Sequence, residues 1–114
     1  MKVNIVATEA HERGKIYKIR ADGKTVRVLF TFHSLGRMRR WRLADRRVLL
    51  ALLFPEEVLR GHRGRFIAHR RVGRHVVRAV YEYEGKTPVV VTVYYPFAER
   101  YFQGGEIYED QILS

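Results

Sequence analysis

The stretch from His33 to Arg78 holds most of the side chains that could do chemistry. Thirteen of its 46 residues are arginine, four are histidine and none is lysine, whereas only Asp45, Glu56 and Glu57 are acidic. The stretch therefore carries a net charge of +10, and the rest of the chain sums to zero. A field of one sign on one part of a small protein indicates a polyanionic partner, and a guanidinium matches phosphate oxygens in pairs. We expect that partner to be nucleic acid, RNA before DNA.

Cleavage of RNA through its own 2′-hydroxyl group is one chemistry that these residue types allow. It needs a group that accepts the hydroxyl proton, a group that protonates the leaving oxygen, and fixed cations for the charge that develops on the phosphate. One of four histidines could transfer protons: His33, His62, His69 or His75. Tyr94 or Tyr95 could be the acid. Arginines of the same stretch could hold the phosphate. The candidate catalytic residues are His33, Arg37, Arg70, Arg78 and Tyr94.

Each candidate also has a simpler interpretation. On the expected strands, Arg70 and Arg78 each share a face with apolar residues, and an arginine in such a place usually has an anionic partner. For Arg78 that partner could be Glu82, which would lie on the same face of its strand. His69 would lie on the opposite face from Arg70 and could simply be solvated. His33 could cap a helix, and the tyrosines could belong to the core.

The remaining basic residues of the stretch are expected to form a wider nucleic-acid-binding surface. The set comprises Arg39, Arg40, Arg46, Arg47, Arg63, Arg65, His69, Arg71 and Arg74. In a non-catalytic RNA- or DNA-binding module these residues would supply the contacts without any cleavage. A domain whose arginines grip an acidic protein, with no nucleic acid involved, is a third interpretation. The few carboxylates do not form the cluster that a hard cation needs and the chain has no cysteine, so we expect neither a metal nor another cofactor.

Length and composition indicate a single domain that spans residues 1–114. A chain of 114 residues, of which 46% are hydrophobic, can bury a modest core. No apolar run approaches the roughly 20 residues that a membrane helix needs, and the N-terminus lacks the pattern of a signal peptide. We therefore expect a cytoplasmic protein without membrane contact.

The elements that must position the basic residues follow an order of strands, two helices and strands again. Strands are expected at residues 2–7, 15–20 and 25–32, the last with clear alternation, and later at residues 58–60, 65–72, 74–84 and 88–95. The strand at residues 88–95 is the most apolar and should be central. The acidic tail, residues 96–114, predicts no firm structure beyond a short strand or helix around residues 106–113. The expected fold is α+β, with two short helices packed on a mostly antiparallel sheet. An additional N-terminal hairpin would extend this sheet or mediate a homodimer.

The two expected helices cover residues 34–41 and 46–53. His33 or Ser34 could cap the first helix, whose buried stripe would contain Leu35, Met38 and Trp41. Asp45 could cap the second helix. Arg46 and Arg47 would then lie at its N-terminus, where the helix dipole disfavours cations, which is easier to understand if an anion binds there. A helix-turn-helix led by these arginines is an alternative, although eight residues is short for a recognition helix.

Several motifs between residues 31 and 95 agree in order and spacing with a known pattern. They are H-x-x-x-R-M-x-R from His33 to Arg40, V-L-x-x-L from Val48, P-x-x-V from Pro55, a basic hairpin, and V-T-V-Y that closes at Tyr94. In these motifs the chain resembles small domains of the RelE/BrnT-like toxins. The resemblance implies a toxin of a type II toxin–antitoxin pair that cleaves mRNA, in association with the ribosome or alone, and that an acidic antitoxin protein inhibits. Some relatives act on DNA gyrase instead. Residues 1–30 and 96–114 lie outside the resembling core.

Overall fold

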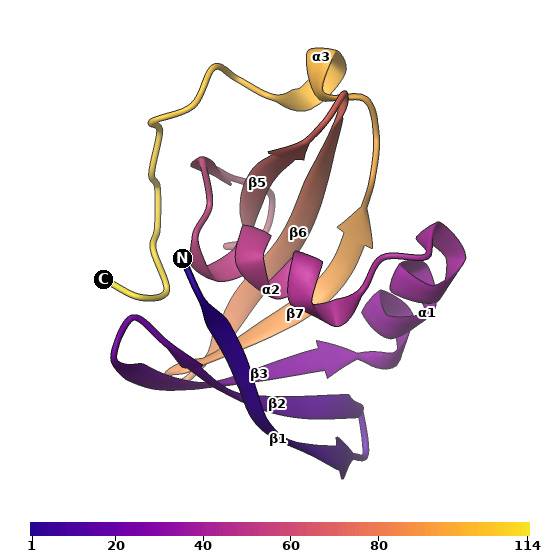
Figure 1. Ribbon diagram of the computed structural model, residues 1–114, viewed down its shortest axis with the longest axis vertical. Helices are drawn as coiled ribbons and strands as arrows, with labels where there is room; N and C mark the ends of the chain where they lie inside the picture. Colours follow the sequence, from indigo (N-terminus) through magenta and orange to yellow (C-terminus); the bar gives the residue numbers. More distant parts are fainter.

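One seven-stranded sheet runs through the chain in the computed structural model, which describes residues 1–114 (Figure 1). In space the strand order is β1-β2-β3-β7-β6-β5-β4, and all neighbours are antiparallel except β3 and β7. The predicted α+β class with a mostly antiparallel sheet is confirmed. Along the chain the elements are β1 (Val3–His11), β2 (Gly14–Ala21), β3 (Lys24–Thr31), α1 (Phe32–Trp41), α2 (Asp45–Leu53), β4 (Glu57–Arg60), β5 (Phe66–Val72), β6 (His75–Glu84), β7 (Thr87–Tyr94) and α3 (Ala98–Tyr101).

The apolar sequence of β7 places it in the middle of the sheet, as predicted. It pairs with β6 on one side, and on the other it pairs in parallel with β3 through Leu29–Val89 and Phe30–Val90. A central strand is covered on both faces, and Val89, Val90 and Val93 are indeed fully buried. The parallel contact arises because α1 and α2 carry the chain from the end of β3 to the far edge at β4, from which β5, β6 and β7 return.

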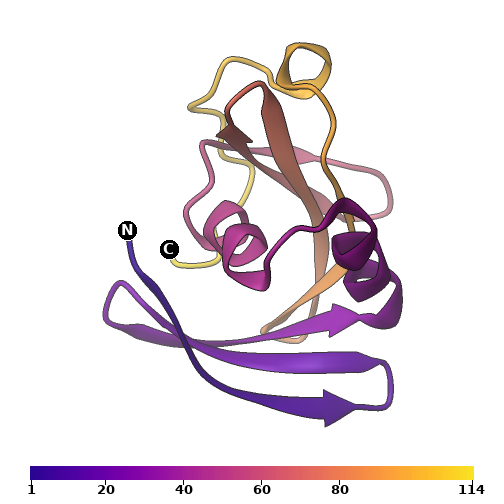
Figure 2. The ribbon, with the colours of Figure 1, turned by 45° about the vertical axis from the view of Figure 1, so that its right-hand side comes forward.

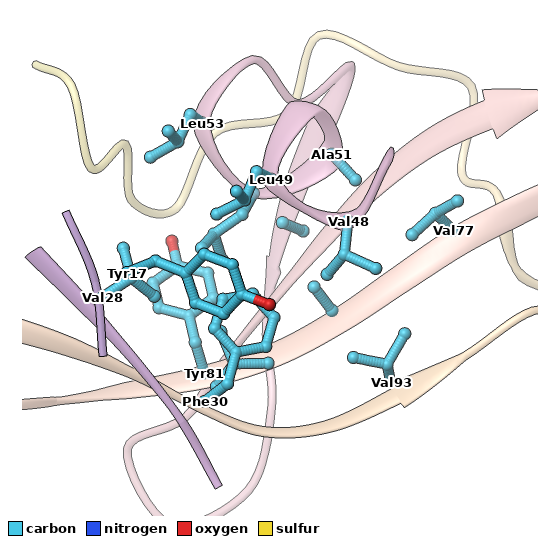
Figure 3. Packing of buried hydrophobic residues seen from close by; sticks show 14 of the residues in the cluster. Tyr17, Val28, Phe30, Val48, Leu49, Ala51, Leu53, Val77, Tyr81 and Val93 are labelled. Atoms are coloured by element: carbon cyan, nitrogen blue, oxygen red, sulfur yellow. The ribbon is translucent and has the colours of Figure 1, made fainter. Parts of the chain in front are cut away.

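Both longer helices cover one face of the sheet, and the hydrophobic core lies between them and the strands (Figure 2). From α2, Val48, Leu49 and Leu52 are buried against this face. Tyr17 of β2 and Phe30 of β3 meet them, with ring centroids 4.9 Å apart (Figure 3). On the opposite face, the chain that follows β7 lies across part of β4, β5 and β6.

The first helix begins earlier than predicted, because Thr31 caps it in place of His33 or Ser34. The Thr31 hydroxyl oxygen accepts a hydrogen bond from the Ser34 backbone N–H at 3.1 Å, and the Ser34 hydroxyl donates to the Thr31 carbonyl at 2.8 Å. The helix therefore starts at Phe32, whose side chain is exposed and does not continue the buried face of β3.

Two further predictions about the helices are wrong. Trp41, expected in the core, is 40% exposed, because α1 ends there and the next residue turns into a left-handed conformation. Asp45 does not cap α2 but is its first residue, after Ala44, which makes no side-chain cap. The Asp45 carboxylate instead accepts hydrogen bonds from the Arg46 N–H at 2.7 Å and from the Tyr17 hydroxyl at 3.1 Å.

The tail forms the short helix α3, which was not predicted, and then returns along the outer edge of the sheet at β4. No helix or strand forms at residues 106–113, but the Val58 N–H donates to the Ile107 carbonyl at 2.6 Å and one parallel bridge joins Val58 to Tyr108. Asp110 then accepts hydrogen bonds from the Tyr81 and Tyr83 hydroxyls, both at 2.6 Å. At the other edge, β1 and β2 continue the sheet beyond β3. None of the three helices has the length and apolar character needed to cross a membrane.

Candidate nucleic-acid interface

A row of polar side chains crosses the sheet on the face opposite to α1 and α2. The strand register pairs Glu57 of β4 with His69 of β5, His69 with Arg78 of β6, and Arg78 with Tyr94 of β7. Directly paired residues share a face, and alternate residues along a strand point to opposite faces. The row therefore faces away from the core, whereas the residues next to it in the chain lie in the core: Val58, Ala68, Val77, Ala79 and Val93.

Arg78 is a half-buried cation that forms no ion pair with a carboxylate. Its Nη1 donates to the His69 Nε2 at 3.0 Å, and its guanidinium carbon lies 4.5 Å from the centre of the Tyr101 ring. Burial lowers the pKa of Arg78 from its ordinary value, against opposing contributions from Tyr101 and Tyr94, although arginine stays charged in proteins. Removing a charge from water costs several kcal/mol, so this guanidinium is suited to an anion from outside the protein.

Glu57 and His69, the neighbours of Arg78 in this row, are fully buried. The His69 Nδ1–H donates to a Glu57 oxygen at 2.7 Å, and the backbone N–H groups of Gln103 and Gly105 donate to the same carboxylate at 2.8 and 2.9 Å. Because arginine is only a donor, the His69 Nε2 must accept from Arg78, which leaves the proton on Nδ1 and the ring neutral. Burial lowers the pKa of His69 below its ordinary value, against the opposing effect of the hydrogen bond to Glu57.

The burial of His69 corrects two expectations from the sequence. His69 is not solvated, because 0% of its side chain is exposed. Because the ring is buried, His69 also cannot contact RNA directly, although the sequence placed it in the expected nucleic-acid-binding surface. The residues that follow α3 cover the His69 side chain. The alternation of side chains along β5 cannot predict that a distant segment covers one of its faces.

A cavity of about 320 Å³ opens beside Arg78 at the end of β7. Its walls come from α1, β6, β7 and the segment around α3, and they consist of Trp41, Arg78, Tyr94, Tyr95, Pro96 and Tyr101. Three of these aromatic side chains are well exposed for their size: Trp41, Tyr94 and Tyr101. Exposed rings beside a cation are the arrangement that proteins use to stack bases next to a phosphate contact.

A second hollow of about 430 Å³ continues along the same face from Tyr94. It is lined by Gly61, His62, Arg63, Arg65, Ile67, Val80, Thr92 and Tyr94. Because Tyr94 borders both spaces, we treat the two together as one open-face groove. Arg37 of α1 adds a cation near its middle, with the guanidinium carbon 5.4 Å from the centre of the Tyr94 ring. The buried Thr92 hydroxyl oxygen in this groove has no hydrogen-bond partner within the protein.

Two of the predicted nucleic-acid contacts already have carboxylate partners. Arg65 pairs with Glu82 at 2.9 Å, and Arg71 pairs with Glu56 at 2.8 Å. Glu82 is therefore not the partner of Arg78 that the sequence allowed. Ion pairs at exposed positions contribute little to stability, but they reduce the positive charge that Arg65 and Arg71 offer to a polyanion.

Arg70, a candidate catalytic residue, lies on the helix side of the sheet and away from the open-face groove. It pairs across the strands with Val77, which belongs to the core. Its Nη1 donates to the Phe54 carbonyl at 2.7 Å, and Phe54 is the C-cap residue directly after α2. The anionic partner that its apolar surroundings suggested is thus the negative end of a helix. The structure does not bring Arg70 together with Arg78.

His33 lies exposed in the first turn of α1 and lines neither part of the open-face groove. Close to it in the chain, a set of exposed arginines without ion pairs surrounds the connection between α1 and α2. We call it the joint patch, and it consists of Arg39, Arg40, Arg42, Arg46 and Arg47. The Arg40 guanidinium carbon lies 5.8 Å from the centre of the Trp41 ring, so the joint patch adjoins the cavity.

Of the other predicted residues, some line the groove and some lie outside it. His62 and Arg63 line it in the turn between β4 and β5. His75 stacks its ring on those of Tyr95 and Phe97, at 4.6 and 4.7 Å between centroids. Arg74 is exposed at the turn before β6.

Three residues of the site are not identified as such by the sequence: Glu57, Trp41 and Tyr101. Pairing the expected strands 58–60 and 65–72 through a turn at residues 61–64 would place Glu57 opposite Ala68, whereas the observed register pairs Arg60 with Phe66 and Glu57 with His69. The sequence therefore contains no signal for Glu57. Trp41 fits a buried helical stripe equally well, and Tyr101 lies in a tail without periodicity. For these two residues only the aromatic side chain itself is a signal.

The fold and the groove define an α+β protein with a basic and aromatic face. No group of three or more His, Cys, Asp or Glu side chains lies close enough together to hold a metal ion. No protein-family model, curated protein or solved structure matches the chain.

Proposed function

We propose that the open-face groove binds single-stranded RNA, with Arg78 against a phosphate and the neighbouring aromatic rings against bases. The observation that carries the proposal is Arg78 itself, a half-buried guanidinium without a carboxylate partner on the wall of an aromatic cavity. A guanidinium pairs with phosphate oxygens, and stacking of one base on an aromatic side chain contributes about 1–3 kcal/mol. A duplex keeps its bases stacked on one another, so the rings favour a single strand.

The distribution of charge supports a polyanionic ligand in this place. The protein carries a net charge of +10, and the five arginines of the joint patch have no ion pairs. The joint patch adjoins the cavity through Arg40 and Trp41, so an RNA strand that leaves the cavity on this side meets further cations. Such contacts release counterions from the RNA and make binding depend on salt.

We extend the proposal to a ribonuclease toxin of the RelE/BrnT type that cleaves mRNA by attack of the 2′-hydroxyl. Two helices on one face of a mostly antiparallel sheet agree with what the resemblance implies. Arg78 would stabilise the negative charge that develops on the phosphate during attack. The hydroxyls of Tyr94 and Tyr101, which line the same cavity, would be the nearest groups for proton transfer. An acidic antitoxin would cover the same basic face until its release.

A non-catalytic RNA-binding module is the second candidate, and a specific observation favours it. Neither His33 nor His69 reaches the cavity beside Arg78, and no other histidine lines it. A protonated phenol can donate a proton to the leaving oxygen but does not act as the base that takes the 2′-hydroxyl proton. The groove could therefore hold RNA without cleaving it.

Induced expression of the full chain in bacteria tests both candidates. Wild type is compared with Arg78→Met and with Arg20→Met, which removes an exposed arginine of β2 without an ion pair. Growth arrest with cleaved transcripts, abolished only by Arg78→Met, is the result expected for a toxin. Intact transcripts, together with RNA binding by the purified protein that Arg78→Met weakens, would assign the non-catalytic module. Purified wild type that binds no RNA at low salt would overturn both.

A further inference from the structure

Two ionisable side chains, Glu57 and His69, lie buried beside Arg78 in the row of polar residues that crosses the sheet. Both are 0% exposed, and neither can touch a ligand. Burying such a pair costs free energy that two apolar residues of similar size would not cost. The other buried side chains of β4 and β5, Val58 and Ala68, are apolar.

We propose that the Glu57–His69 pair positions Arg78 for the phosphate, so that both are positioning residues of the RNA site. This inference rests on the proposed function and specifies how its central residue is held. The connection is continuous: the Glu57 carboxylate accepts from the His69 Nδ1–H at 2.7 Å, and the His69 Nε2 accepts from the Arg78 Nη1 at 3.0 Å.

A neutral imidazole between a carboxylate and an arginine has a specific advantage. A carboxylate in direct contact with Arg78 would orient it, but would also neutralise its charge and occupy two of its donors. Through His69, Glu57 orients the guanidinium at the cost of a single N–H donor, because arginine has five. The remaining donors and the positive charge stay available to a phosphate in the cavity beside Tyr94 and Tyr101.

The Glu57 carboxylate also fixes one wall of that cavity. It accepts backbone hydrogen bonds from Gln103 and Gly105, which closely follow Tyr101 in the chain. Gly105 has a φ of +88°, a conformation that favours glycine, and a Cβ there would meet the Phe102 ring at 3.5 Å. One carboxylate thus holds both Arg78, through His69, and the segment that carries the Tyr101 ring.

Two amide variants separate the roles of the two His69 nitrogens. In His69→Gln the longer side chain brings its amide oxygen to the position of Nε2, where it can accept from Arg78. In His69→Asn the shorter amide reaches the position of Nδ1, where it can donate to Glu57 but cannot accept from Arg78. Val58→Ala is the matched control, because it removes buried methyl groups from β4 on the core side of the strand.

Binding of a fluorescein-labelled single-stranded oligouridine to the full chain is measured by fluorescence anisotropy, and unfolding of each variant is measured in parallel. We expect His69→Gln to bind within about threefold of wild type and His69→Asn to bind at least about tenfold more weakly, since tenfold corresponds to losing about one ordered hydrogen bond. Val58→Ala should lower stability without weakening binding. Equal binding by both His69 variants, or losses that simply follow stability in all three variants, would overturn the proposal.

A second measurement separates failure of this proposal from failure of the proposed function. The guanidinium of Arg78 gives nitrogen-15 NMR signals that report how freely it rotates, whether or not RNA binds. We expect restricted rotation in wild type and His69→Gln, and fast rotation in His69→Asn. If wild type binds no oligouridine, the proposed function is wrong. The Arg78 guanidinium signals still decide whether His69 positions Arg78. Restricted rotation that persists in His69→Asn would overturn the positioning role.

Discussion

Replacing Arg70 by methionine should lower stability and leave RNA binding unchanged. Arg70 donates from Nη1 to the Phe54 carbonyl at 2.7 Å, where α2 ends. A hydrogen bond from a charged donor contributes about 1.5–3 kcal/mol, and a cation at a helix C-terminus adds about 0.3–1 kcal/mol. Methionine keeps much of the apolar stem. We therefore expect the free energy of unfolding to fall by about 2–4 kcal/mol, which lowers Tm by roughly 10–20 °C in a domain of this size.

Urea unfolding followed by circular dichroism measures the change, and Arg78→Met is the contrasting variant. Arg78→Met removes a desolvated charge but leaves the His69 Nε2 without its donor, so the two effects on stability oppose each other and we expect a change below about 1 kcal/mol. Its RNA affinity should fall at least about tenfold, whereas that of Arg70→Met should stay at the wild-type value. If Arg70→Met weakened RNA binding as much as Arg78→Met and left stability intact, the assignment of Arg70 to α2 would be wrong.

Three further outcomes are expected. In an anisotropy titration, Trp41→Ala should weaken RNA binding by about 1–3 kcal/mol, which is the contribution of one stacked base. The stability of this variant should change little. An unchanged RNA affinity would exclude stacking on Trp41. Arg63→Gln should reduce the slope of log affinity against log salt by about 0.7, the value for one phosphate contact on a single strand, and an unchanged slope would place the strand elsewhere. Because burial lowers the pKa of His69 from 6.5, the unfolded chain binds the proton first as pH falls. The free energy of unfolding should therefore be highest above about pH 6.5 and decrease below it. His69→Gln should show less of this decrease, and equal curves for both proteins would contradict a neutral buried ring.

Most of the fold can be predicted from local hydrophobic patterns in the sequence. Alternation over β3 and β6, and the apolar run of β7, are enough to predict strands, and their order around two helices predicts an α+β sheet with β7 at its centre. The ends of helices are less determined by local pattern, since Thr31, Ser34 and His33 are all acceptable near an N-terminus. Only the hydrogen bond that Thr31 makes decides where α1 begins.

The site is only partly predictable, because similar local patterns lead to different surroundings. Arg70 and Arg78 both lie among apolar residues on neighbouring strands, yet the register puts them on opposite faces of the sheet. The Arg70 guanidinium contacts the C-terminal end of α2, and the Arg78 guanidinium lines the cavity. The burial of His69 depends on Glu57 and on the segment near Gln103, which are distant in sequence and carry no periodic signal.

The most direct test of the RNA-binding groove is an NMR titration of the full chain with a short single-stranded RNA. The indole N–H of Trp41 and the guanidinium signals of Arg78 and Arg70 are followed together. We expect the Trp41 and Arg78 signals to shift with a common Kd, while the Arg70 signals do not move. Shifts confined to Arg46 and Arg47 of the joint patch, with Arg78 unaffected, would contradict this expectation.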